Sequence, residues 1–215
     1  MKCIFFVISI AILLAGCDSS MPEGKPIVCF GDSLTEGYGA GGAGRVDKSK
    51  SYPAFLQRKV KMPVVNSGIS GDTTAGALAR LESDVLSHDP QMVIILLGAN
   101  DFFQQRPVAQ AKTNLQEIIN RTRDEDRKIY LVSFIGDLNW ESSILDTIAG
   151  AFMSEYTTLL IEYGRMFNEL ISENRDIYFI PNIWQGVWRT HMSDPIQPNA
   201  SGYERIAETI YQAIK

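Results

Sequence analysis

Residues 27–34 read Ile27-Val28-Cys29-Phe30-Gly31-Asp32-Ser33-Leu34, an apolar run that ends in a small turn carrying a hydroxyl. Four consecutive apolar residues bounded by Gly and Asp are typical of a strand that is buried on both faces. A Ser hydroxyl directly after such a strand can be exposed for attack, while its own N–H points into the same space. Ser33 is therefore a candidate nucleophile.

Further apolar runs follow along the chain and alternate with segments of helical periodicity. The predicted strands lie near residues 27–30, 63–66, 92–97, 128–133 and 177–180. Three helical stripes are Leu78, Leu81 and Val85; Leu115, Ile118 and Thr122; and Tyr203, Ile206 and Ile210. Strands that alternate with helices form a parallel sheet covered on both faces. The sequence predicts a three-layer α/β/α sandwich with a five-stranded parallel sheet.

The size and charge of the chain limit its organisation and its partners. A chain of 215 residues with 45% hydrophobic and 21% charged residues suits one globular domain, which we place at residues 26–215. The formal net charge is −5 and no Lys/Arg cluster is present, so a nucleic-acid partner is not expected. No group of His, Cys, Asp and Glu has the spacing of metal ligands, and we expect neither a metal nor another cofactor.

The first residues are expected to be a targeting segment. Lys2 precedes the apolar run Ile4–Leu14, and Leu14-Ala15-Gly16-Cys17 is similar to the bacterial lipobox. That resemblance implies a signal peptide at residues 1–16, a lipid-modified Cys17 and a short tether at 17–25. It places the protein in a bacterial cell envelope, anchored to a membrane and facing the periplasm or the exterior. A transmembrane anchor and plain secretion stay open as alternatives, although the run is short for a span.

Polar residues follow four of the predicted strands. They are Gly31-Asp32-Ser33, residues Asn66 to Asp72, Gly98-Ala99-Asn100-Asp101, and the segment Asp194–Asn199 before the last helix. Ligands bind at the carboxyl ends of strands in an open parallel sheet, so these segments are expected to meet at one site. The N–H groups of Ser33 and Gly71 and the amide of Asn100 could together form an oxyanion hole.

These blocks resemble, in order, those of the SGNH (GDSL) hydrolase family, and most closely its bacterial lysophospholipase, thioesterase and arylesterase branch. The resemblance covers nearly all of residues 17–215 and implies a flavodoxin-like topology. Carried over residue by residue, it implies Ser33 as nucleophile, Ser33, Gly71 and Asn100 as oxyanion donors, and Asp194 as the residue that orients the base. It also implies a small acyl ester or a lipid-derived ester as the substrate.

The fourth block departs from the family pattern Asp-x-x-His-Pro-Asn, because Gln197 stands where the family has its catalytic His. A primary amide cannot accept a proton near neutral pH, although Gln197 could hydrogen-bond to Ser33 and Asp194 at once. Two hypotheses follow. One is a serine esterase that forms an acyl-enzyme on Ser33, with its activity in doubt; the other is a lipoprotein that binds an acyl or acetylated ligand without turnover. Transfer of the acyl group to a sugar, and the oligomeric state, stay open.

The two His residues of the chain have different expected positions. His88 precedes the third strand and is expected at the opposite edge of the sheet, exposed to solvent, whereas His191 lies three residues before Asp194 and is a possible substitute base. Among the carboxylates, Asp32 is expected to brace the turn. Asp72 and Asp101 are expected to accept backbone N–H groups, with Asp72 a possible helix N-cap.

Three further segments have ordinary interpretations beside functional ones. Trp184 and Trp188 either line an acyl pocket, lie against a bilayer or pack in the core. The segment Gly39–Gly44 lacks the Lys-Ser/Thr ending of a phosphate-binding loop and is expected to be a mobile surface loop beside the site. The long stretch 140–176, with apolar residues at roughly helical intervals from Ile148 and Phe152 onward, is expected to pack over the sheet and is a candidate wall of the cleft.

Overall fold

The structure, a computed structural model, describes residues 24–135 and 154–215. The predicted signal peptide 1–16, the lipidation site Cys17 and the apolar residues Ile148 and Phe152 lie outside these ranges. Five parallel strands form one sheet in the order β2-β1-β3-β4-β5. They are β1 (Ile27–Gly31), β2 (Val64–Gly68), β3 (Met92–Leu96), β4 (Lys128–Val132) and β5 (Tyr178–Ile180). The predicted five-stranded parallel sheet and its flavodoxin-like order are confirmed.

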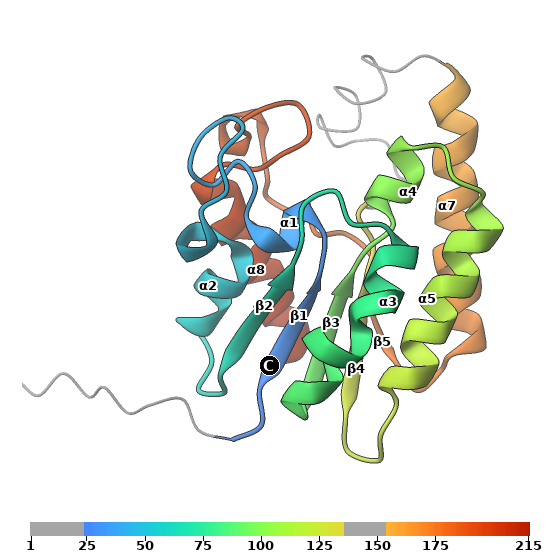
Figure 1. The fold of residues 1–215 in the computed structure, drawn as a ribbon. Helices are drawn as coiled ribbons and strands as arrows, with labels where there is room; N and C mark the ends of the chain where they lie inside the picture. The colour runs from blue at the N-terminus through green and yellow to red at the C-terminus, as the bar shows by residue number, and fades with distance from the viewer. Residues whose placement is uncertain (1–23, 136–153) are drawn as a thin grey trace, which may run out of the picture.

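Helices cover both faces of the sheet, as Figure 1 shows. On one face lie α2 (Tyr52–Gln57) and α8 (Ala200–Ile214), and on the other lie α3 (Thr74–Asp84), α5 (Val108–Thr122) and α7 (Ser154–Glu173). Shorter elements lie in the connections: α1 (Ser33–Glu36), α4 (Ala99–Phe103), η1 (Lys48–Lys50), η2 (Leu86–His88) and η3 (Arg189–His191). The chain therefore has the predicted three layers.

The core lies between the sheet and these helices. Every residue of β1 and β3 is buried, as expected for central strands covered on both faces. Cys29 is fully buried in β1, and burial raises the pKa of its thiol to about 12, so it is a small apolar core residue. The predicted helical stripes face the core, except that Leu78 is only partly buried. The described end of the long 140–176 stretch is helix α7, which buries Tyr163, Phe167 and Leu170.

Strand β2 extends further at its C-terminal end than the sequence predicted. It continues to Gly68, so Asn66 and Ser67 lie within the strand and not after it. Polar residues are tolerated there because their side chains find partners: Asn66 Nδ2 donates to Ser51 Oγ and Ser67 Oγ donates to the carbonyl of Asp84. The register pairs Gly31 of β1 with Gly68 of β2, which brings the ends of these strands to one level.

This carboxyl edge of the sheet carries α1, α4 and the loop before α8, whereas the chain enters β1 at the other edge (Figure 1). None of the helices in the described ranges is both long and apolar enough to cross a membrane.

Candidate active site

The turn that carries Ser33 is fixed from several sides. β1 ends at Gly31, and Asp32 caps α1 by accepting the Leu34 N–H on Oδ1 at 3.0 Å. The Ser33 carbonyl accepts the N–H groups of Gly37 and Tyr38, which closes the one-turn helix. Because Asp32 is held in this way, the predicted brace of the turn is confirmed, and Ser33 is held at the mouth of the strand.

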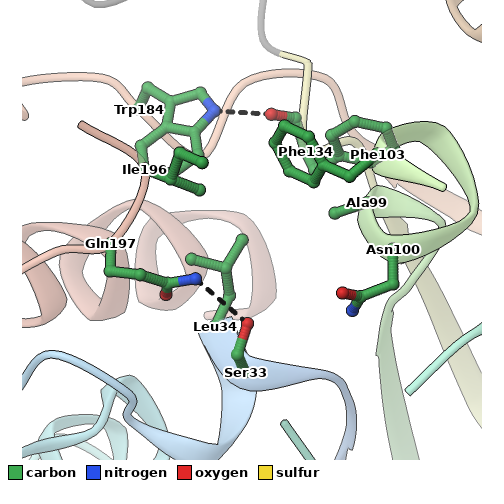
Figure 2. A pocket seen from close by; sticks show the side chains of 9 residues that line it. All are labelled: Ser33, Leu34, Ala99, Asn100, Phe103, Phe134, Trp184, Ile196 and Gln197. Carbon is green, nitrogen blue, oxygen red and sulfur yellow. Dashed lines mark hydrogen bonds between the residues drawn. The ribbon is translucent and has the colours of Figure 1, made fainter. Parts of the chain in front are cut away.

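The hydroxyl of Ser33 meets the side chain of Gln197 (Figure 2). Gln197 Nε2 donates a hydrogen bond to Ser33 Oγ at 3.2 Å. The other amide atom, Gln197 Oε1, is buried and has no hydrogen-bond partner among the described residues. A neutral amide in this position orients the hydroxyl but takes no proton from it.

Asp194 shapes the loop that carries Gln197. Asp194 Oδ1 accepts the backbone N–H groups of Ile196 at 2.9 Å and of Gln197 at 2.7 Å, while Gln197 O accepts the Ser193 N–H at 2.8 Å. The structure places no hydrogen bond between the Asp194 carboxylate and the Gln197 side chain, as far as the described residues show. The prediction that Gln197 bridges Ser33 and Asp194 is therefore wrong in its second half, because the Gln197 amide donates to Ser33 while Asp194 Oδ1 accepts backbone N–H groups of its own loop.

Asn100 lies across the cavity from Gln197, on the first turn of α4 (Figure 2). Its Nδ2 donates to the carbonyl of Asp72 at 2.9 Å and to Asp32 Oδ2 at 3.3 Å. Both N–H groups of this amide are thus engaged, and the longer contact, to Asp32, is the one that a substrate oxyanion would replace more easily.

The two predicted backbone donors have no acceptor of their own. Within the described ranges, the N–H groups of Ser33 and Gly71 make no hydrogen bond. Gly71 is exposed and has a φ of +81°, a conformation that favours glycine. Ser33 and Asn100 line the same cavity, whereas Gly71 is not one of its lining residues.

The acidic residues of the blocks have structural partners. Asp101 is buried and accepts the backbone N–H and the hydroxyl of Thr74 at 2.8 Å each, so the prediction of a backbone acceptor holds for it. For Asp72 it is wrong. The N-cap of α3 is Thr73, and Asp72 instead accepts from Arg80 Nε at 2.7 Å, because the long Arg80 side chain extends from the second turn of α3 back toward the start of the helix.

Burial raises the pKa of Asp32 to about 7, and repulsion by the carboxylates of Asp72 and Asp101 adds to the rise, while the hydrogen bond from Leu34 opposes it. The charge of Asp32, which directly precedes Ser33, is therefore expected to change near neutral pH. Its side chain faces Leu34 and Asn100.

A mainly apolar cavity of about 240 Å³ opens next to Ser33. Its lining residues are Ser33, Leu34, Ala99, Asn100, Phe103, Phe134, Trp184, Ile196 and Gln197. Trp184 is held by a hydrogen bond from Nε1 to the carbonyl of Phe134 at 2.6 Å, so Trp184 lines the pocket, whereas Trp188 is 59% exposed and lies outside it. Apolar walls with a few polar groups at one end suit a short acyl group.

Phe103, Phe134 and Ile196 also line the pocket, although the sequence did not identify them as pocket residues. Phe134 comes two residues after β4 ends, so its position at a strand end was a usable signal. An apolar residue at a strand end does not stand out in the sequence as Ser33 and Asn100 do, because it also fits ordinary core packing.

Neither His residue is placed as a substitute base. His88 is exposed and lies at the end of η2, just before β3 begins, so it is at the amino end of that strand and away from the cavity at the carboxyl ends, as predicted. His191 Nδ1 accepts the backbone N–H of Trp188 at 2.9 Å, and His191 is not a lining residue of the cavity.

The glycine-rich segment 39–44 forms a turn and not an anion-binding loop. Gly39 N–H donates to the carbonyl of Arg45, and Gly39 itself is buried with a φ of +87°. A Cβ at this position would lie 2.7 Å from the carbonyl of Pro198 and 3.1 Å from Gln197 Cβ. The loop therefore packs against the segment that carries Gln197, a role that its composition did not reveal.

The chain is thus a five-stranded parallel α/β protein with a Ser at the end of its first strand and an amide donor after its third, at the edge of the sheet where such proteins bind ligands. The sequence profile of the GDSL-like Lipase/Acylhydrolase family matches residues 29–205. The chain belongs to this family.

Characterised relatives match over nearly the whole chain. Esterase TesA of Pseudomonas aeruginosa is 26% identical, over 95% of this chain and 98% of the esterase. An arylesterase of Vibrio mimicus is 31% identical, over 95% of this chain and 96% of the arylesterase. Among solved structures, a crystal structure of TesA superposes with a TM-score of 0.71 at 26% identity, covering 88% of this chain and 98% of that one.

Proposed function

We propose that the protein is a serine ester hydrolase of esterase, thioesterase or lysophospholipase type, which acts on acyl esters through an acyl-enzyme on Ser33. The observation that carries this proposal is the apolar cavity that ends at the Ser33 hydroxyl, with Asn100 on its other side. The membership of the chain in an acylhydrolase family supports it.

The chemistry assigns a role to each of these groups. Ser33 Oγ attacks the carbonyl carbon of the ester, and the negative charge that develops on the carbonyl oxygen is stabilised by Asn100 Nδ2 and the N–H groups of Ser33 and Gly71. The tetrahedral intermediate collapses, the alcohol or thiol leaves with a proton, and the acyl group stays on Ser33. Water then attacks the acyl-enzyme, and the acid is released as Ser33 regains its proton.

Gln197 makes these reaction steps slow. The Ser33 proton has to pass to water, because the amide of Gln197 donates to Ser33 Oγ and accepts no proton. Removal of the base in serine hydrolases lowers turnover by up to about 10⁶, leaving a residual acceleration of about 10³–10⁴ over water from the oxyanion donors and binding. We therefore expect slow acylation rather than none.

Covalent labelling tests the nucleophile directly. The full chain is incubated with a fluorophosphonate probe, and the modified residue is identified by mass spectrometry. We expect slow labelling of Ser33 and none in Ser33→Ala. Labelling that is equal in Ser33→Ala would remove Ser33 as the nucleophile.

Gln197 also favours a second candidate function: the protein binds an acyl or acetylated ligand without turnover. Gln197 donates a hydrogen bond to Ser33 Oγ. This bond keeps the two side chains together at the cavity, although neither of them is a base. In that case a short-chain acyl ligand binds equally well to the unaltered chain and to Ser33→Ala, and no product is released from the ester.

We further propose that the protein is a lipoprotein of the bacterial cell envelope, anchored through acyl chains on Cys17 and facing the periplasm or the exterior. The support is the sequence Leu14-Ala15-Gly16-Cys17 after an apolar run. Expression in a bacterial host with labelled palmitate tests this: the membrane fraction should carry label that Cys17→Ala lacks. Membrane label in Cys17→Ala would contradict it.

A further inference from the structure

The guanidinium of Arg80 lies beneath the site, on α3, and its side chain is only 13% exposed. It donates to Asp72 Oδ2 at 2.7 Å, to the carbonyl of Gly31 at 2.9 Å and to the carbonyl of Ser67 at 2.9 Å. A fourth bond, 2.9 Å long, joins it to Asp84 Oδ2 on its own helix. The guanidinium carbon also lies 4.5 Å from the centre of the Phe30 ring. A planar group with several fixed donors is suited to hold separate segments in one geometry.

The partners of Arg80 belong to the segments that carry the oxyanion donors. Gly31 is two residues before Ser33, and Asp72 directly follows Gly71. The carbonyl of Asp72 accepts Asn100 Nδ2 at 2.9 Å. Arg80 therefore connects, through one bond to Gly31 and one to Asp72, the three places from which Ser33, Gly71 and Asn100 would donate.

Gly71 depends on its neighbours for its position. Apart from its chain neighbours, none of the described residues has an atom within 4 Å of the place where a Cβ at Gly71 would lie, so a side chain there would meet open space. On one side Glu36 Oε2 accepts the N–H of Ser70 at 2.9 Å, and on the other side Asp72 is bound to Arg80. The loop is also held by the Ile69 N–H, which donates to the carbonyl of Gly31 at 3.1 Å, and by the Asp72 carbonyl, which accepts from Asn100 Nδ2, so loss of the bond to Arg80 leaves other contacts in place.

We propose that Arg80 is a positioning residue that, through Asp72, fixes the Gly71 N–H relative to Ser33 and Asn100. The inference rests on the proposed function, since it concerns the oxyanion donors of that reaction. Donors act only when they are held at the place where the charge develops, and a misplacement of about 1 Å can lower a rate by about 10².

The two carboxylates that accept hydrogen bonds from Arg80 provide a matched test. Asp72→Ala and Asp84→Ala each remove one charged partner of the same guanidinium, but only Asp72 lies in the Gly71 loop. The full chain is labelled with [¹⁵N]glycine, and the amide resonance of Gly71 is assigned through a Gly71→Ala variant. We expect that this resonance moves in Asp72→Ala and stays in place in Asp84→Ala. The rate of phosphonate labelling at Ser33 should fall about 10- to 100-fold in Asp72→Ala alone.

Arg80→Lys keeps the charge but lacks the planar guanidinium that bridges the segments. This variant replaces Asp72→Ala in the experiment if Asp72→Ala unfolds. We expect it to move the Gly71 resonance as well. A Gly71 resonance that is unmoved in Asp72→Ala and in Arg80→Lys, or moved equally in Asp84→Ala, would overturn the inference. If Ser33 is not labelled even in the unaltered chain, the proposed function fails. The Gly71 resonance alone then tests whether Arg80 fixes the position of the Gly71 N–H.

Discussion

Gln197 Nε2 lies 3.2 Å from Ser33 Oγ and donates to it, so the position that faces the proposed nucleophile is filled by a hydrogen-bond donor rather than by a proton acceptor. Its other amide atom, Oε1, is buried without a partner among the described residues, although buried polar atoms normally have one. The site that we propose for acyl transfer thus has an amide, and no proton acceptor, in contact with the Ser33 hydroxyl.

Gly39 is predicted to be required for the position of the Gln197 loop. Gly39→Ala should lower the free energy of unfolding by more than Gly42→Ala, because a Cβ at Gly39 would collide with the carbonyl of Pro198 and the hydroxyl of Ser193, whereas a Cβ at Gly42 meets nothing within 4 Å. Both glycines have a positive φ, which costs about 1–2 kcal/mol for alanine in each variant. Overpacking adds about 1–3 kcal/mol at Gly39 alone. Urea unfolding of the two variants measures the difference, and equal losses would show that the contact is absent.

Asp32 is predicted to make the protein less stable as the pH rises from about 4 to about 7. Its pKa is raised from 3.8 to about 7 in the folded chain, chiefly by burial, so in this range the folded state holds a proton that the unfolded state has lost. The free energy of unfolding therefore falls as the pH rises through this window and levels off above it. Unfolding by urea between pH 4 and pH 8 tests this.

Asp32→Asn is the matched variant for that measurement, because its side-chain oxygen can still accept the Leu34 N–H while it carries no charge. We expect the part of the pH dependence that belongs to this window to disappear in Asp32→Asn. A pH dependence that is the same in both proteins would assign the effect to other groups.

His191 is predicted to have no part in the reaction. Its Nδ1 is engaged as acceptor of the Trp188 N–H, so in the neutral ring the proton is on Nε2 and no lone pair is available to Ser33. The rate of Ser33 labelling in His191→Ala should stay within about twofold of the unaltered rate. A fall of the size seen in Ser33→Ala would identify His191 as the base.

Much of the fold could be predicted because it depends on periodic apolar patterns. The sequence shows the apolar run of the strand Ile27–Gly31 and the helical stripe of Tyr203, Ile206 and Ile210. The structure buries both. The end of β2 was misplaced because Asn66 and Ser67 look like loop residues, and only their partners in space make them acceptable in a strand.

The polar residues that line the cavity could be predicted from the sequence, but its apolar wall and the contacts between distant segments could not. Short motifs identified Ser33, Asn100 and Gln197, whereas the bond from Arg80 to Asp72 joins residues eight positions apart, and that from Arg80 to Gly31 joins residues 49 positions apart. The apolar wall formed by Phe134 and Trp184 likewise depends on the order of the strands. Such contacts follow from the topology of the sheet and have no signature in any one segment.

The central claim is that the scaffold is a hydrolase site without its base. The most direct test compares hydrolysis of a short-chain nitrophenyl ester by the unaltered chain and by Gln197→His, with Ser33→Ala in each background as control. We predict slow, Ser33-dependent hydrolysis by the Gln form and a gain of several orders of magnitude, up to about 10⁶, in the His form. A Gln form that is already as fast as Gln197→His, or a His form that gains nothing, would contradict the claim.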